Sequence, residues 1–140
     1  MKNLLNISEA ANIALHTCTY LAGQLGRKVS SKEIAQKYSI SETHLAKVLQ
    51  RLVRGGLLRS VRGPGGGFEL VADPADLVLL QVLEAIEGPL PQGYCLFENR
   101  VCDRSQCIMG DELRTIHDNL RDYFTKTRLS SLVQKDKDSS

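Results

Sequence analysis

The chain has 140 residues, of which 42% are hydrophobic, and it carries a formal net charge of +2. This length accommodates one globular domain, or a small domain with an appendage. No stretch approaches the roughly 18 consecutive apolar residues that span a bilayer, and the first residues are too briefly apolar for a secretory signal. We therefore expect a cytoplasmic protein that makes no contact with a membrane.

The charge is unevenly distributed along the chain. The segment from Arg27 to Arg62 contains nine basic residues and two acidic ones, a net charge of +7, which leaves −5 for the remainder. A basic block within an otherwise acidic chain is typical of a surface that faces phosphate groups. The alternative, a solvated charged face, usually has Glu and Asp interspersed among the Lys and Arg.

The first half of the chain predicts three helices. Ser8 can cap the first of them, which has an apolar stripe at three- and four-residue steps. Ser30 and Glu33 form a capping box, in which the hydroxyl and the carboxylate both satisfy orphan amides at the start of a second helix. Ser41 can cap a third helix that reaches about Arg54. Two short helices joined by a tight turn, the second basic on its outer face, are typical of a helix-turn-helix.

A β-hairpin is predicted directly after the third helix. Residues 57–62 and 68–71 have the composition of strands, and a turn of glycines and one proline separates them. This order of elements indicates a wing, whose glycine-rich tip can approach another surface closely. The alternatives are a flexible hairpin turn and a helical protein–protein module with an exposed basic helix.

The third helix and the wing together contain the residues that we expect to contact DNA. The first half of a recognition helix places side chains at base edges, so Lys47 is a candidate donor to guanine. Gln50 and Arg51 lie where phosphates or flanking bases are reached, and Arg62 can enter a narrow minor groove. The predicted set is Thr43, His44, Lys47, Gln50, Arg51, Arg59, Arg62, Gly63, Pro64 and Gly65.

Two further helices are predicted in the second half of the chain. Asp73 and Pro74 have the pattern of a helix N-terminus, and an apolar stripe follows them as far as Ile86. A longer helix is expected from about Met109 to Lys126. The residues after 133 are polar and predict a disordered tail.

Three cysteines lie within thirteen residues of the segment between these two helices, at Cys95, Cys102 and Cys107. Thiolates so closely spaced can converge on one metal centre, whereas disulfides would leave one cysteine over. Three thiolates suit an iron–sulfur cluster or zinc, and either would take a fourth ligand. The alternatives are that these cysteines react as thiols without a metal, or that they have no sensing role. The candidates for a fourth ligand are an exogenous small molecule, Glu9, Asp111, Glu112, His117 and the partner subunit's His16.

Residues 8–128 resemble the Rrf-type winged-helix transcriptional regulators, the group of IscR, NsrR and CymR. The likeness is carried by short motifs and by one long string at the wing, namely Ser8-Glu9-Ala10, Ala14-Leu15, Tyr20-Leu21-Ala22, Glu33-Ile34-Ala35, Ile40-Ser41, Leu49-Gln50-Arg51-Leu52 and residues 56–68. The resemblance implies a homodimer held by the long C-terminal helix, which binds a near-palindromic operator in double-stranded DNA. It also implies an iron–sulfur cluster, 2Fe–2S or 4Fe–4S, on Cys95, Cys102 and Cys107.

The chain departs from the family pattern around this cluster. Six residues separate Cys95 from Cys102 and four separate Cys102 from Cys107, where family members usually have equal spacings. Gly110 stands where an IscR-like member has a histidine ligand, and Asn12 stands where an NsrR-like member has an acidic one. A cluster-free regulator controlled by thiol chemistry or by a partner protein, as in CymR, is therefore the alternative to a repressor that senses redox, nitric oxide or iron–sulfur status.

The predicted fold is mainly α with a small β-wing. We divide it into a winged helix-turn-helix domain (1–88), a cysteine loop with a dimerisation helix (89–128), and a C-terminal segment with a polar, disordered tail (129–140). An enzyme is not expected, because the chain has no Cys-x-x-Cys pair and no nucleotide-binding glycine pattern.

Overall fold

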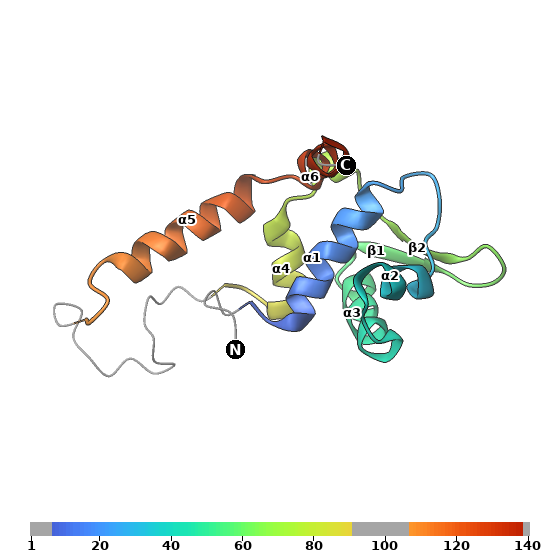
Figure 1. Ribbon diagram of the computed structural model, residues 1–140, viewed down its shortest axis with the longest axis horizontal. Helices are drawn as coiled ribbons and strands as arrows, with labels where there is room; N and C mark the ends of the chain where they lie inside the picture. The colour runs from blue at the N-terminus through green and yellow to red at the C-terminus, as the bar shows by residue number, and fades with distance from the viewer. Residues whose placement is uncertain (1–6, 91–106, 139–140) are drawn as a thin grey trace.

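The computed structural model describes residues 7–90 and 107–138, with side chains as far as Val133 (Figure 1). Helices dominate, and the described strands form one antiparallel hairpin. The expected fold class, mainly α with a small wing, is confirmed. The elements in chain order are α1 (Glu9–Ala22), α2 (Ser31–Tyr38), α3 (Glu42–Arg54), β1 (Leu58–Val61), β2 (Gly67–Leu70), the 3-10 helix η1 (Pro74–Asp76), α4 (Leu79–Glu87), α5 (Glu112–Lys126) and α6 (Leu129–Asp138).

Helix α1 is the centre of the core. Its inward face consists largely of small residues, among which Ala11, Ala14, Thr17 and Cys18 are completely buried. Small side chains let neighbouring backbones approach closely, and α1 accordingly packs against α3, α4, α6 and β2 (Figure 1). Cys18 is one of these small core residues.

The predicted caps of the first three helices are present. The hydroxyls of Ser8, Ser30 and Ser41 accept hydrogen bonds from backbone amides three residues further on, at distances of 3.0 to 3.1 Å. Ser39 ends α2 in the left-handed conformation, with φ of 54°, and so turns the chain into α3. The apolar face of α3 then lies fully in the core through Leu45, Val48, Leu49 and Leu52.

The capping box that we expected at the start of α2 is only half formed. Ser30 caps the helix, but the Glu33 carboxylate does not return to the Ser30 amide. It instead accepts two hydrogen bonds from Arg27, at 3.0 and 2.6 Å, and one from the hydroxyl of Tyr20. A charge-assisted, bidentate pair with a guanidinium is stronger than a bond to one amide. The carboxylate therefore links α2 to α1 and to the loop between them.

The wing is attached to the helical core at its base. Strands β1 and β2 pair from Leu58 with Leu70 to Val61 with Gly67. Val29, in the loop before α2, adds a short bridge to Phe68, with N···O distances of 3.0 and 2.8 Å. A Cβ atom on Gly67 would lie 2.5 Å from the Val29 carbonyl oxygen, so this close approach requires glycine.

The helix that we predicted to start at Asp73 and Pro74 starts later. These residues open only the three-residue η1, and the chain is extended at Leu77. The reason lies far away in sequence: Leu79 donates to the Thr127 carbonyl at 3.0 Å, and Leu129 donates to the Leu77 carbonyl at 2.9 Å. This backbone pairing holds Leu77 and Val78 extended, so α4 begins at Leu79.

The C-terminal prediction was wrong in one respect. We expected a disordered tail after residue 133, but α6 continues from Leu129 to Asp138. Its first residues pack on the core: Leu129 is completely buried, and Leu132 and Val133 lie against it at helical spacing. The preceding helix α5 also begins later than predicted, at Glu112 instead of about Met109.

Across residues 7–90 and 107–138, no helix has both the length and the apolar character needed to cross a bilayer.

The contacts of Glu33 with Arg27 and Tyr20 make the stability of the fold depend on pH. Hydrogen bonds from Arg27 and Tyr20 lower the pKa of Glu33 from 4.5 to about 2. When the pKa of a carboxylate is lower in the folded state than in the unfolded state, the ionised carboxylate stabilises the folded state. This contribution is fully present at a pH above the unfolded-state pKa, and it is lost as the pH falls toward the folded-state pKa.

We expect Glu33→Gln to lower the melting temperature at neutral pH by a few degrees, because a partly exposed ion pair contributes modestly. The difference from the parent protein should persist down to about pH 4.5 and shrink between pH 4.5 and about 2. Thermal denaturation followed by circular dichroism across this range measures it, with Glu84→Gln on the exposed face of α4 as the control. A difference that is constant with pH would contradict the assignment.

Candidate nucleic-acid interface

The outer face of α3 is polar, basic and exposed. Thr43, Lys47, Gln50 and Arg51 are all accessible, while the opposite face of the same helix is buried. Four aliphatic side chains in the core fix the rotation of α3 about its axis. The exposed side chains are therefore presented by a rigid helix that can enter a groove of matching width.

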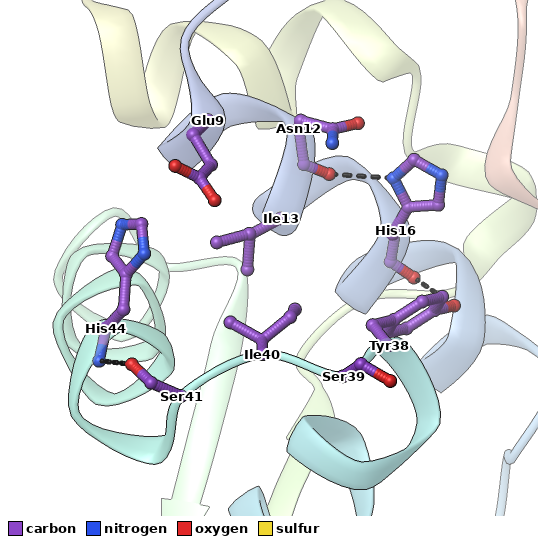
Figure 2. A pocket seen from close by; sticks show the side chains of 9 residues that line it. All are labelled: Glu9, Asn12, Ile13, His16, Tyr38, Ser39, Ile40, Ser41 and His44. Atoms are coloured by element: carbon purple, nitrogen blue, oxygen red, sulfur yellow. Dashed lines mark hydrogen bonds between the residues drawn. The ribbon is translucent and has the colours of Figure 1, made fainter.

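His44 differs from the other predicted contacts on α3. Its side chain is half-buried and lines an open hollow of about 400 Å³ between α1 and the turn that joins α2 to α3 (Figure 2). Across the hollow lie His16 and Tyr38, whose rings meet edge to face at 5.4 Å. Tyr38 also donates to the His16 carbonyl at 3.1 Å, which ties α2 to α1. Sequence reasoning did not find this hollow, since its walls come from three helices.

The tip of the wing protrudes from the body of the molecule (Figure 1). Arg62, Gly63, Pro64 and Gly65 are all exposed there. The Gly66 amide donates to the Gly63 carbonyl at 2.9 Å, which closes the turn. The predicted wing residues therefore lie together at one exposed loop, which follows α3 directly in the chain.

Arg59 is engaged within the wing itself. It faces Glu69 across the two strands, and its Nε lies 3.3 Å from the carboxylate. Both side chains are partly exposed, so the pair is weak and screened by salt. The hairpin register could have predicted this pair, because residues 59 and 69 lie opposite each other about a turn at 63–66.

Arg51 also has a partner inside the protein. Its Nη2 donates to the carbonyl oxygen of Ile86, near the C-terminal end of α4. The partners are 35 residues apart in sequence, so no local pattern could have indicated this contact.

The three clustered cysteines are only partly within the described residues. Cys95 and Cys102 lie outside them, and Cys107 is a half-buried free thiol shortly before α5. Cys18 is the other described cysteine; burial raises the pKa of its thiol to about 12, which keeps it protonated and unreactive. Within residues 7–90 and 107–138, no three His, Cys, Asp or Glu side chains are grouped to hold a metal ion.

Comparisons with known proteins agree on one family. Residues 7–135 match the Rrf2 family, described as iron-dependent transcriptional regulators. The BadM protein of Rhodopseudomonas palustris is 37% identical over 120 residues, which cover 84% of this chain and 70% of that protein. The transcriptional regulator NsrR of Bacillus subtilis is 32% identical over 97 residues, or 69% of this chain and 66% of that protein. The solved structure of CymR, the global cysteine regulator of B. subtilis, superimposes with a TM-score of 0.79 at 26% identity over 94% of this chain and 98% of that one.

Proposed function

The chain belongs to the Rrf2 family of transcriptional regulators, and we propose that it binds a near-palindromic operator in double-stranded DNA as a homodimer. Members of this family regulate transcription and are not enzymes. The observation that carries the proposal is the exposed basic face of α3, held rigidly by the core and followed at once by a protruding wing.

Recognition of DNA would use the two parts of this surface differently. A helix fits the major groove of B-form DNA, which is about 12 Å wide. Lys47 and Thr43 in the first half of α3 would contact base edges, and Gln50 would reach a flanking base or a phosphate. The flat, glycine-rich wing tip would lie along the backbone while Arg62 enters the adjacent minor groove.

The dimer would form along α5. Leu113, Ile116, Leu120 and Tyr123 follow the alternating three- and four-residue steps of a coiled-coil seam. Ile116 and Tyr123 are 45% and 47% exposed in the single chain. Buried Phe124 anchors the end of α5 to the core, while the rest of the helix extends away from the body (Figure 1). A second copy of the same seam would cover these apolar side chains, and would place two recognition helices on successive turns of one duplex.

The regulatory signal would act on Cys95, Cys102 and Cys107. We propose that their thiolates hold an iron–sulfur cluster, 2Fe–2S or 4Fe–4S, as the iron dependence in the family description supports. Cys107 is compatible with this role because it is a free, half-buried thiol, unlike the enclosed Cys18. A bound cluster would supply a centre that reacts with oxidants or nitric oxide, and its loss would release a repressor from the operator.

A second candidate keeps the DNA binding and omits the cluster. The structure of CymR, a global cysteine regulator, is similar over nearly the whole of both chains. This similarity is compatible with a regulator controlled by thiol chemistry or by a partner protein. The unequal spacing of the cysteines favours the same version.

Substitutions on α3 and the wing test the proposed DNA surface. Lys47→Ala should reduce discrimination between a duplex selected by the protein from a random library and an unselected duplex, by about 1–3 kcal/mol. Arg62→Ala should weaken binding most at sites with A/T-rich flanks, where the minor groove is narrow. Titrations monitored by fluorescence anisotropy measure both, with Lys126→Ala on α5 as the control. Affinities that respond to neither substitution would show that another surface binds the duplex.

Charges placed on the α5 seam test the dimer. Ile116→Asp combined with Tyr123→Asp should convert a dimer into a monomer, because four carboxylates would face one another in an apolar interface. Sedimentation equilibrium gives the mass, and far-ultraviolet circular dichroism verifies that the helices persist. Thr115→Asp, outside the seam, should remain dimeric. A parent protein that is monomeric, or a double variant that is still dimeric, contradicts the proposal.

Protein purified without oxygen tests the cluster. We expect visible absorption with stoichiometric iron and sulfide, all of which should disappear when Cys95, Cys102 and Cys107 are replaced by serine. Cys18→Ala is the matched control and should retain them, because its thiol is enclosed in the core. A colourless protein without iron would rule out the cluster and leave the thiol-controlled regulator.

A further inference from the structure

The position of Arg51 does not match that of a simple phosphate contact. It lies in the last turn of α3, on the exposed side of the helix, yet its guanidinium donates to the Ile86 carbonyl of α4. The final carbonyls of a helix have no partner within the helix and carry its partial negative charge. A guanidinium is well suited to this position, because it supplies both a donor and a positive charge.

A second contact brings the same two helix ends together. A Cβ atom on Gly55, which follows α3, would lie only 3.3 Å from the Cβ of Ala85 on α4. The Gly55 amide donates to the Arg51 carbonyl at 2.9 Å, so Gly55 and Arg51 belong to one rigid turn. The C-terminal ends of α3 and α4 are therefore in direct contact through backbone and side chain.

The end of α4 also holds the start of α1. Ser8, which caps α1, donates to the Glu87 carboxylate. Gly88 then ends α4, and the chain enters the segment in which Cys95 follows seven residues later. The last turn of α4 is thus a junction between α1, the recognition helix α3 and the cysteine-containing segment.

From this junction we propose that Arg51 is a positioning residue, which transmits the position of the α4 end to the recognition helix. This inference rests on the proposed function, and it replaces the phosphate role that the sequence predicted for Arg51. A change at the cysteines that displaces the last turn of α4 would move α3 through the Arg51 contact. Without that contact, the spacing of the two recognition helices in a dimer would no longer follow the state of the cysteines.

The first experiment needs no DNA. Amide hydrogen exchange is compared in the parent protein, in Arg51→Gln and in Arg54→Gln, a matched loss of charge one turn further along. We expect faster exchange at the end of α4 and the end of α3 in Arg51→Gln only. Exchange that is the same in all three proteins overturns the inference, whether or not the protein proves to bind an operator.

The second experiment separates positioning from phosphate binding. Affinity for a duplex selected from a random library is measured over a range of salt concentrations, at temperatures where each variant is fully folded. A lost phosphate contact lowers the slope of log K against log salt by about one, for selected and unselected duplexes alike. For Arg51→Gln we expect an unchanged slope and a roughly 3- to 30-fold lower affinity for the selected duplex. Substitutions of residues that contact neither ligand change the coupling between two sites by about this much.

The same variant is then combined with replacement of the three clustered cysteines by serine. In the parent background, these replacements should change operator affinity. In the Arg51→Gln background, the change should be much smaller. A salt slope reduced by about one, or an undiminished response to the cysteine replacements, would overturn the positioning role while leaving the proposed regulator intact. A parent protein that selects no duplex would instead refute the proposed function, with the exchange experiment still deciding the Arg51 contact.

Discussion

The buried face of α1 is the constraint on which the rest of the structure depends. Four completely buried small residues, Ala11, Ala14, Thr17 and Cys18, let α3 and α4 both lie directly against the same helix. Larger side chains at these positions would separate the two helices, since a close-packed core has no space to receive them. The recognition helix, the wing and the end of α4 consequently form one body. A surface that reads DNA needs this rigidity, because base contacts depend on geometry to within a fraction of an ångström.

Interactions close in sequence made much of this arrangement predictable. Serine caps and apolar periodicity are local signals, and they correctly indicated α1, α2 and α3 as well as the order of helix, turn, helix and wing. The errors arose where distant segments decide the local structure. Leu77 and Val78 are extended because they pair with residues 127–129, and no pattern near Asp73 reveals that pairing. The charged residues after 133 predicted disorder, but they belong to a helix whose first turn is held in the core by Leu129.

The same distinction applies to the candidate site. The exposure of Lys47, Gln50 and Arg62 follows from helix periodicity and from the hairpin turn, and the sequence predicted it. The partners of Arg51 and Glu33 are long-range contacts with Ile86 and with Tyr20 and Arg27, and they change what each residue does. Residues with the same charge on one basic segment therefore have different surroundings: Arg27 binds the Glu33 carboxylate, Arg59 faces Glu69 across the wing, and Arg51 connects two helices. Only some of the nine basic residues remain to meet phosphates.

If α3 and the wing bind DNA as one unit, a bound duplex should protect both of them from exchange. Amide hydrogen exchange with and without a duplex that the protein has selected tests this most directly, because it reports every described element at once. We expect slower exchange on binding in both residues 42–54 and residues 58–70, with α6 unchanged. Protection confined to one of these two segments, or located mainly on α5 and α6, would contradict it.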